Sequence, residues 1–199
     1  MFICKKPEKN LRNHDLLLIT GDGKTLPSDL DRFMALEIPH DVATIGRSIQ
    51  LYPGKVTHYV DVDSDAGKWV VEHIPQNHPT KGNPLTHTLG DVQWFDVGWD
   101  IEGCPWPADD VTWHGSTALF AVIIGLAMEY QKIILAGVPL DSKGHWYFPD
   151  QNEGPIWTWQ GYQAWFEFAM SPGAGRVRSM SGYTKIILGE PTLKWIMNS

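Results

Sequence analysis

Residues 16–25 read LLLITGDGKT, and this stretch decides the fold. Its first five residues form an apolar run, which is typical of a strand buried on both faces of a parallel sheet. The turn GDGKT follows at once, and Ser28 is placed to cap a helix over residues 29–37. A buried strand, a glycine-containing turn and a helix in this order predict the first unit of an α/β domain.

The same alternation continues along the chain. Strands are predicted at residues 42–46, 56–62, 92–97, 133–138 and 176–180, and helices at 66–73, 116–130, 156–170 and after Pro191; the rest of 75–107 reads as loop. We therefore expect one α/β domain over residues 1–199, with a mostly parallel Rossmann-like sheet, helices on both faces and a small lid-like insertion at 139–170. The strands at 16–20 and 133–138 should lie near the centre of the sheet.

The amino-acid composition limits which binding partners and which cellular location are expected. The chain has 16 Lys and Arg against 23 Asp and Glu, a formal net charge of -7, which argues against duplex nucleic acid and anionic membranes. Residues 111–128 lack charged side chains but are too interrupted for a membrane span, so we predict a buried helix there. Cys4 and Cys104 have no metal or redox spacing, and the polar N-terminus does not resemble a signal peptide. A cytoplasmic protein is expected, and a homo-oligomer remains open.

The turn after the first strand is the first candidate binding site. Gly21, Asp22, Gly23, Lys24 and Thr25 precede a helix, where glycines allow close approach of a ligand and free amides attract anions. The spacing matches neither a dinucleotide fingerprint nor a P-loop. The alternative interpretation is a plain strand-to-helix turn.

The start of the longest apolar helix is the second candidate. His114, Gly115, Ser116 and Thr117 open it, and its first amides can meet a phosphate or a base. Helix capping alone would also explain Ser116. Because both segments are expected at the carboxyl edge of the sheet, we predict that a small ligand binds between them.

Residues 141–150, DSKGHWYFPD, follow the strand predicted at 133–138 and therefore reach the same edge. They combine titratable and aromatic side chains, among them Asp141, His145 and Tyr147, which favours a functional loop over a merely solvated one. A metal centre is not expected. Asp61, Asp63 and Asp65 alternate, but a strand end with Asp65 capping a helix explains them better than a metal site. His73, His78 and His87 have no zinc-site spacing and are interpreted as surface residues.

The segment HGSTALFAVIIGLAMEYQKIILAGVPLD, residues 114–141, resembles a helix and strand of bacterial CMP-sialic-acid-dependent sialyltransferases. The following SKGHWYFPD is similar to the start of their lid, and Tyr147 and Asp150 match its Tyr-x-x-Asp pattern. Archaeal pterin diphosphokinase-like domains and short phage-encoded proteins share this architecture. Their first strand ends in Gly-Asn-Gly-Pro-Ser-Leu, whereas Asp22 stands here in place of the Asn that touches the nucleotide.

The resemblance implies a nucleotide-sugar-binding, glycosyltransferase-like protein that performs inverting transfer. A CMP-sugar is the first expected donor, and no further cofactor is required. Tyr147 would then assist the departing phosphate. The family's catalytic histidine has no counterpart between residues 151 and 178, so His145 is the best base, with Asp141 orienting it or replacing it.

Two other functions stay open. The first is a non-catalytic nucleotide-binding or structural module of the phage accessory kind, since fold does not fix function. The second is pyrophosphoryl transfer of the pterin diphosphokinase kind, which would require magnesium on Asp61 and Asp63.

Overall fold

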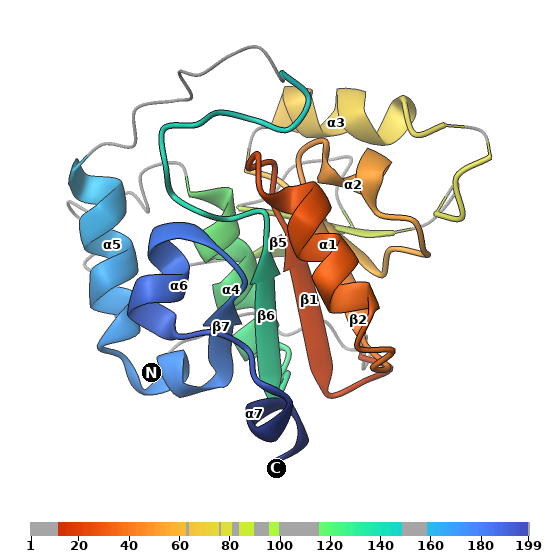
Figure 1. The fold of residues 1–199 in the computed structure, drawn as a ribbon. Coiled ribbons are helices and arrows are strands. Elements are labelled where there is room, and N and C mark those ends of the chain that lie inside the picture. Colours follow the sequence, from red (N-terminus) through yellow and green to blue (C-terminus); the bar gives the residue numbers. More distant parts are fainter. Residues whose placement is uncertain are drawn as a thin grey trace.

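The computed structural model of the chain describes residues 12–62, 64–75, 77–80, 84–89, 96–99, 116–148 and 159–198. Within them, seven strands form one sheet in the order β5-β4-β3-β2-β1-β6-β7 (Figure 1). Every neighbouring pair is parallel, so the predicted mostly parallel α/β Rossmann-like fold is confirmed.

The elements alternate along the chain as the sequence predicted. The strands are β1 (Leu16–Thr20), β2 (Asp41–Ile45), β3 (His58–Val60), β4 (Leu85–Leu89), β5 (Val97–Trp99), β6 (Lys132–Ala136) and β7 (Val177–Ser179). The helices are α1 (Leu26–Met34), α2 (Ser48–Leu51), α3 (Ser64–Glu72), α4 (Thr117–Ala127), α5 (Trp159–Ala169), α6 (Gly182–Leu188) and α7 (Leu193–Met197), with a 3-10 helix η1 (Pro172–Arg176) before β7.

Two hydrophobic cores lie on opposite faces of the sheet. Alternate residues of a strand point to opposite faces, so Leu17 and Ile19 of β1 pack with α4, α5 and α6, whereas Leu16 and Leu18 pack with α1, α2, α3 and α7. Helices therefore cover both faces, as predicted. β1 is buried along its whole length, which explains the continuous apolar run in its sequence.

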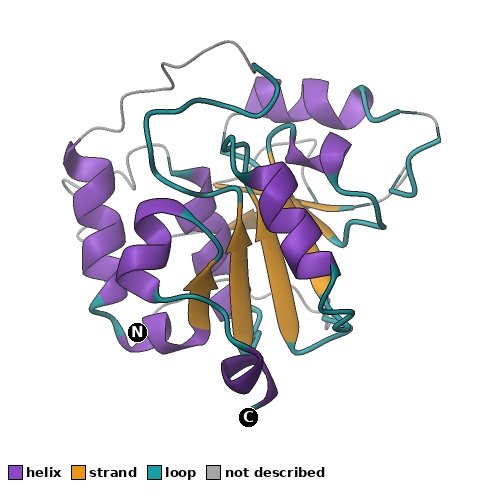
Figure 2. Cartoon of the chain, in the orientation of Figure 1, coloured by secondary structure: helices purple, strands orange, loops and turns teal. Residues whose placement is uncertain are grey.

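The order of the strands marks where a ligand site is expected. The chain runs from β1 outward to β5 and then returns to β6, on the other side of β1. The carboxyl ends of β1 and β6 thus form the topological switch point, the usual ligand position in open α/β sheets. The loop that follows β6 rises from this point and crosses above the arrowheads of the strands (Figure 2).

Several elements of the structure differ from the prediction, and α2 is one that was not predicted. The first helix begins at Leu26 instead of residue 29, and the Ser28 hydroxyl donates to the carbonyl of Thr25 within it, so Ser28 is not its cap. The predicted loop at 75–107 contains β4, and β5 begins where the strand predicted at 92–97 should end; residues 92–95 lie outside the described part. α6 was not predicted at all.

The predicted lid at 139–170 divides into two parts. Its second part forms α5, whose Ala164, Trp165 and Phe168 belong to the hydrophobic core, so this helix is part of the body of the domain. Residues 139–148 remain as the part that crosses the carboxyl edge. No helix of the described ranges is long and apolar enough to cross a membrane, and α4 is the buried helix that the sequence predicted.

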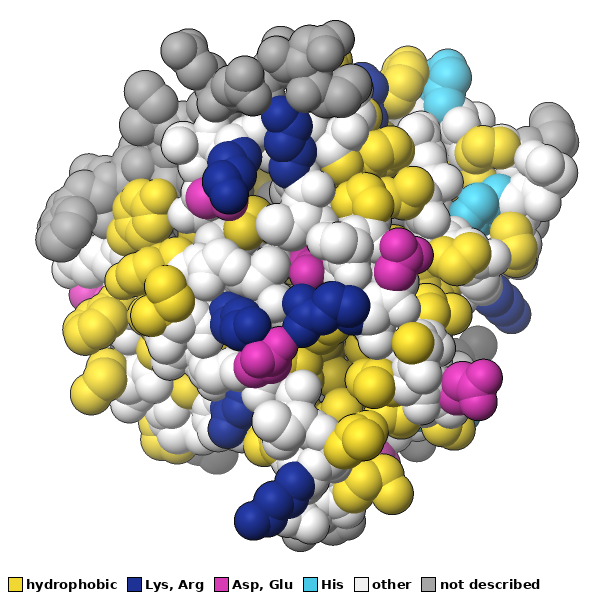
Figure 3. All heavy atoms as spheres, viewed as in Figure 1, with side chains coloured by type: hydrophobic (Ala, Val, Ile, Leu, Met, Phe, Trp, Pro, Cys, Tyr) yellow, Lys and Arg dark blue, Asp and Glu magenta, His cyan; other side chains and the backbone are white. Residues whose placement is uncertain are grey.

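One side of the surface is apolar. Phe166 of α5, Met170 directly after α5 and Ile186 of α6 are exposed, and Figure 3 shows hydrophobic side chains gathered on the side of the molecule where these helices lie. The homo-oligomer that the sequence left open is neither supported nor contradicted by this face.

Candidate functional site

The loop after β1 is held by the segment that follows β6. The amide of Gly21 donates to the carbonyl of Ala136 (2.9 Å) and that of Gly23 to the carbonyl of Gly137 (2.8 Å). The amide of Lys24 donates to the carbonyl of Gly144 (3.1 Å), and Gly23 forms an antiparallel bridge with His145. These three amides, predicted to meet a phosphate, are therefore already used inside the protein.

The glycines of this loop are required by the same contact. A Cβ atom on Gly21 would lie 2.8 Å from the carbonyl oxygen of Gly137, and one on Gly23 would lie 2.4 Å from Pro139. Side chains at either position would push the two segments apart. The glycine signal in the sequence thus reports close packing of two loops at the switch point and not, by itself, the approach of a ligand.

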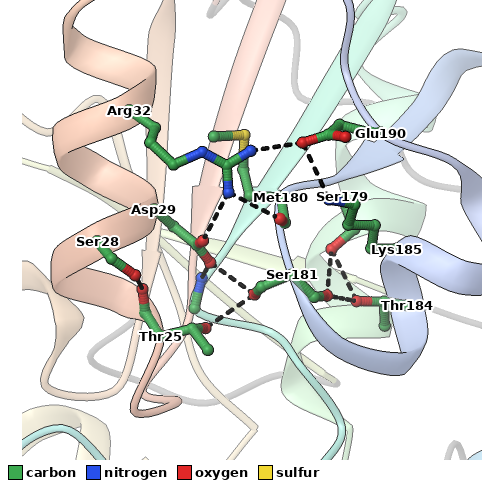
Figure 4. A network of polar contacts seen from close by, with 11 residues as sticks. Thr25, Ser28, Asp29, Arg32, Ser179, Met180, Ser181, Thr184, Lys185 and Glu190 are labelled. Atoms are coloured by element: carbon green, nitrogen blue, oxygen red, sulfur yellow. Dashed lines mark hydrogen bonds and ion pairs between the residues drawn. The ribbon is translucent and has the colours of Figure 1, made fainter.

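Asp29 of α1 holds the segment after β6 and the segment before α6. This buried side chain accepts hydrogen bonds from the amide of Gly137 (3.0 Å) and the hydroxyl of Ser181 (2.6 Å), and Figure 4 shows the network around it. The Thr25 hydroxyl pairs with the same Ser181 hydroxyl at 2.8 Å. Thr25, another predicted binding residue, therefore serves to join α1 to the segment before α6.

Asp22 lies beneath the surface of the candidate site. Its carboxylate accepts a hydrogen bond from the amide of Arg47 (3.0 Å) and, at 3.4 Å, from the Trp146 indole, while the amide of Trp146 donates to the Asp22 carbonyl. Burial raises the pKa of this carboxyl to about 6, with a smaller contribution from the charge of Asp61. Asp22 thereby links the loops after β1, β2 and β6.

Arg47 and Trp69 complete the site, although neither was predicted as a site residue. Arg47 follows β2, and its guanidinium carbon lies 4.7 Å from the centre of the Tyr147 ring and 5.0 Å from that of Trp69 on α3. His145 stacks on Tyr147, with ring centres 5.1 Å apart and planes within 3°. Four side chains from three separate segments thus form one stacked group, which we call the Arg47 stack (Arg47, Trp69, His145 and Tyr147).

The two predicted catalytic residues of the stack have shifted pKa values. Burial lowers the pKa of His145, and its Nδ1 atom is buried with no hydrogen-bond partner in the described part of the chain. Burial also raises the pKa of Tyr147, and the negative charge of Asp22 adds to this effect. At neutral pH the imidazole is therefore a neutral base and the phenol a hydrogen-bond donor.

Asp141 does not join these residues. Its carboxylate accepts a hydrogen bond from the amide of Lys143 (3.1 Å) and lies 4.0 Å from the Lys143 ammonium group. Among the described residues Asp141 bonds to Lys143 and forms no hydrogen bond with His145. Its predicted role in orienting the base therefore finds no support in the geometry.

Of the predicted second segment, Ser116 and Thr117 are described, whereas His114 and Gly115 lie outside the described residues. Ser116 is fully buried, caps α4 by accepting from the amide of Leu119 (3.3 Å), and accepts the indole N–H of Trp165 at 3.0 Å. Its hydroxyl is thus part of the helix cap, the structural interpretation of Ser116 given above.

A metal centre finds no support in the described residues, where no group of three His, Cys, Asp or Glu side chains is placed to hold an ion. The Asp61 carboxylate accepts the hydroxyl of Tyr59 at 2.8 Å. Asp63 and the side chain of Asp65 lie outside the described part of the chain. The helix α3 begins at Ser64, so Asp65 lies within its first turn and not before it, where the predicted cap would stand.

A second polar network is buried at the amino end of β2 and β3. His87 pairs with His58 (3.1 Å), His58 pairs with the hydroxyl of Tyr130 (2.9 Å), and Tyr130 donates to Asp41 (2.8 Å). The prediction that His87 is a surface residue is wrong, since its side chain is fully buried. Burial lowers the pKa of His58 to about 4 and that of His87 well below its ordinary value.

Comparisons of the chain with protein-family models, with curated proteins and with solved structures gave no match.

Proposed function

We propose that this chain binds a nucleotide sugar at the carboxyl edge of β1, β2 and β6 and transfers the sugar, with His145 as general base and Tyr147 as donor to the departing phosphate. One observation carries the proposal. His145 and Tyr147 are stacked on one another and are held at the topological switch point by the bridge between His145 and Gly23. Titratable side chains with shifted pKa values at the carboxyl edge of a parallel sheet are typical of a catalytic site.

The chemistry follows from the protonation states. His145 takes the proton of an acceptor hydroxyl, whose oxygen forms a bond to the anomeric carbon on the side opposite the phosphate. The bond between that carbon and the phosphate oxygen breaks, and the phosphate leaves with the electron pair. Tyr147 donates a hydrogen bond to the leaving oxygen. A single displacement of this kind inverts the anomeric centre, and the proposal uses no metal.

A non-catalytic nucleotide-binding or structural module is the second candidate. The closed contact between the loops after β1 and β6 favours it, because the amides of Gly21, Gly23 and Lys24 are already hydrogen-bonded. Under this reading the Arg47 stack would hold a ligand or fix the loops without chemistry.

Calorimetry against a panel of nucleotides, followed by transfer and donor-hydrolysis assays, separates the two candidates. For the transfer reaction, His145→Ala should lower the rate about 10²- to 10⁴-fold with little change in nucleotide affinity. Tyr147→Phe should slow the same step because the leaving oxygen loses its donor. The ordinary pKa of a histidine is about 6.5, and the pKa of His145 is lowered from it. As the pH decreases, the rate should therefore begin to fall only below pH 6.5.

His14→Ala is the matched control, because His14 is an exposed histidine next to the amino end of β1. It should leave rate and affinity unchanged. Full activity of His145→Ala would remove His145 from the mechanism. Nucleotide binding without any transfer or hydrolysis by the wild-type chain would support the non-catalytic module instead.

A further inference from the structure

Arg47 differs from every other arginine of the chain. There are five arginines, and all of them lie in the described ranges. Arg12, Arg32, Arg176 and Arg178 donate to backbone carbonyls, and two of them also pair with carboxylates. The guanidinium of Arg47 meets no acceptor among the described residues, and only its backbone amide is used, by Asp22.

The side chain is nevertheless held in place. Gly46 before it has a φ of +56°, and a Cβ atom there would lie 2.3 Å from the Asp22 carboxylate, so this turn requires glycine. The Arg47 guanidinium that follows this turn lies over both the Trp69 ring and the Tyr147 ring. Aromatic rings attract a guanidinium by cation–π interaction and occupy its faces, which leaves the N–H groups at its edge for hydrogen bonds in the plane.

We infer that Arg47 binds the phosphate group of the nucleotide, in place of the amides of residues 21–24. The inference rests on the proposed function and names its anion-binding residue. A planar guanidinium with two parallel N–H donors matches a phosphate in bidentate geometry. The protein carries a net charge of -7, so an arginine fixed at this edge with no carboxylate partner in the described part of the chain supplies the positive charge that a phosphate requires.

The position also agrees with the proposed chemistry. Tyr147 contacts both Arg47 and His145, so a phosphate on Arg47 lies within the same group of side chains as the proposed leaving-group donor and base. Trp69 is 44% exposed, and the stack is therefore open to solvent on the side of α3.

Calorimetry with CMP, cytidine and inorganic pyrophosphate tests the assignment in the wild-type chain and in Arg47→Gln, Arg47→Lys and Arg178→Gln. Wild type should bind CMP at least about 10-fold more tightly than cytidine, and Arg47→Gln should lower CMP affinity about 10- to 100-fold, to the level of cytidine. Arg47→Lys should fall between them, because the charge remains and the bidentate geometry is lost. Arg178→Gln is the matched control, since Arg178 also stacks on a tryptophan, at 4.9 Å, but donates to the Val177 carbonyl.

The outcomes separate the two proposals. Equal affinity of wild type for CMP and cytidine, or unchanged CMP affinity in Arg47→Gln, overturns the phosphate assignment and leaves nucleotide binding intact. Binding of pyrophosphate that requires Arg47, without binding of either nucleoside compound, overturns the proposed function and retains the anion site. No binding of any probe to wild type overturns both. Thermal unfolding of each variant shows whether a loss of affinity comes from a loss of fold, and Arg47→Lys provides the test if Arg47→Gln does not fold.

Discussion

The carboxyl group of Asp22 joins three segments and is buried while doing so. Its folded pKa of about 6 lies above the unfolded value near 3.8. Between these two pH values Asp22 is protonated in the folded chain and ionised in the unfolded chain. The stability of the folded chain therefore falls as the pH rises through this window. Above pH 6 the cost reaches about 3 kcal/mol, obtained from about 1.4 kcal/mol per pKa unit.

Asp22→Asn should remove this pH-dependent cost. The amide oxygen can still accept hydrogen bonds, and the group no longer ionises. The difference in unfolding free energy between variant and wild type should become more favourable to the variant by about 3 kcal/mol from pH 4 to pH 8, with the change confined to the window below pH 6. Urea denaturation at several pH values measures it, and a difference that is constant with pH would contradict the raised pKa.

At the scale of elements, Ser116 shows how one hydroxyl can serve two helices. It caps α4 and accepts the indole N–H of Trp165, a core residue of α5. Ser116→Ala should lower the unfolding free energy by about 2 to 4 kcal/mol, because a cap of about 1 kcal/mol is lost and a buried indole N–H is left without a partner. Thermal or urea unfolding provides the measurement.

Thr192→Ala is the matched control, since Thr192 caps α7 through the same kind of bond, to the amide of Trp195, at an exposed position. It should cost about 1 kcal/mol or less. A similar loss of unfolding free energy in Ser116→Ala and Thr192→Ala would show that the hydrogen bond from Trp165 to Ser116 does not stabilise the fold. In the double variant Ser116→Ala/Trp165→Phe, the loss should be smaller than the sum of the single losses, because the two residues share one bond.

The sequence could predict those buried elements whose own residues are apolar. β1 is buried on both faces and its five residues are nearly all apolar, so its bounds match the prediction. β4 is equally internal, between β3 and β5, yet it reads Leu-Thr-His-Thr-Leu. Partners from distant segments compensate its polar side chains, as Asp96 does for Thr86 and His58 for His87. Such partners are not visible in a local pattern.

For the whole molecule, parallel topology allowed the position of the site to be predicted but not its residues. The rule that ligands bind at carboxyl ends of strands led to Asp22, His145 and Tyr147, and the structure brings these three together. Arg47 follows a predicted strand directly, which is the signal that could have identified it. Its place beside Trp69 and Tyr147 depends on how α3 and the loop after β6 lie in space, and no sequence spacing gives that.

The network of His87, His58, Tyr130 and Asp41 links three strands to the segment after α4 and should determine the acid limit of the fold. Both imidazoles are neutral and fully buried. As the pH falls below the unfolded value near 6.5, the unfolded chain binds protons that the folded chain does not, so stability decreases. For His58, whose folded pKa is about 4, the loss reaches about 3 kcal/mol at pH 4.

As the pH falls, protonation of Asp22 stabilises the fold by an amount similar to the loss from His58. His87 also destabilises the fold at low pH, so the net change in unfolding free energy is a decrease. We therefore expect the wild-type unfolding free energy to fall between pH 6.5 and pH 4, and to fall more steeply in Asp22→Asn. His58→Leu/His87→Phe should flatten the decrease, since apolar residues of similar volume replace both partners of the buried pair while Tyr130 keeps its bond to Asp41. Urea unfolding at pH 4.5, 5.5, 6.5 and 7.5 compares the slopes, with His14→Ala as the exposed-histidine control. An unchanged slope in the double variant would show that other groups set the acid limit.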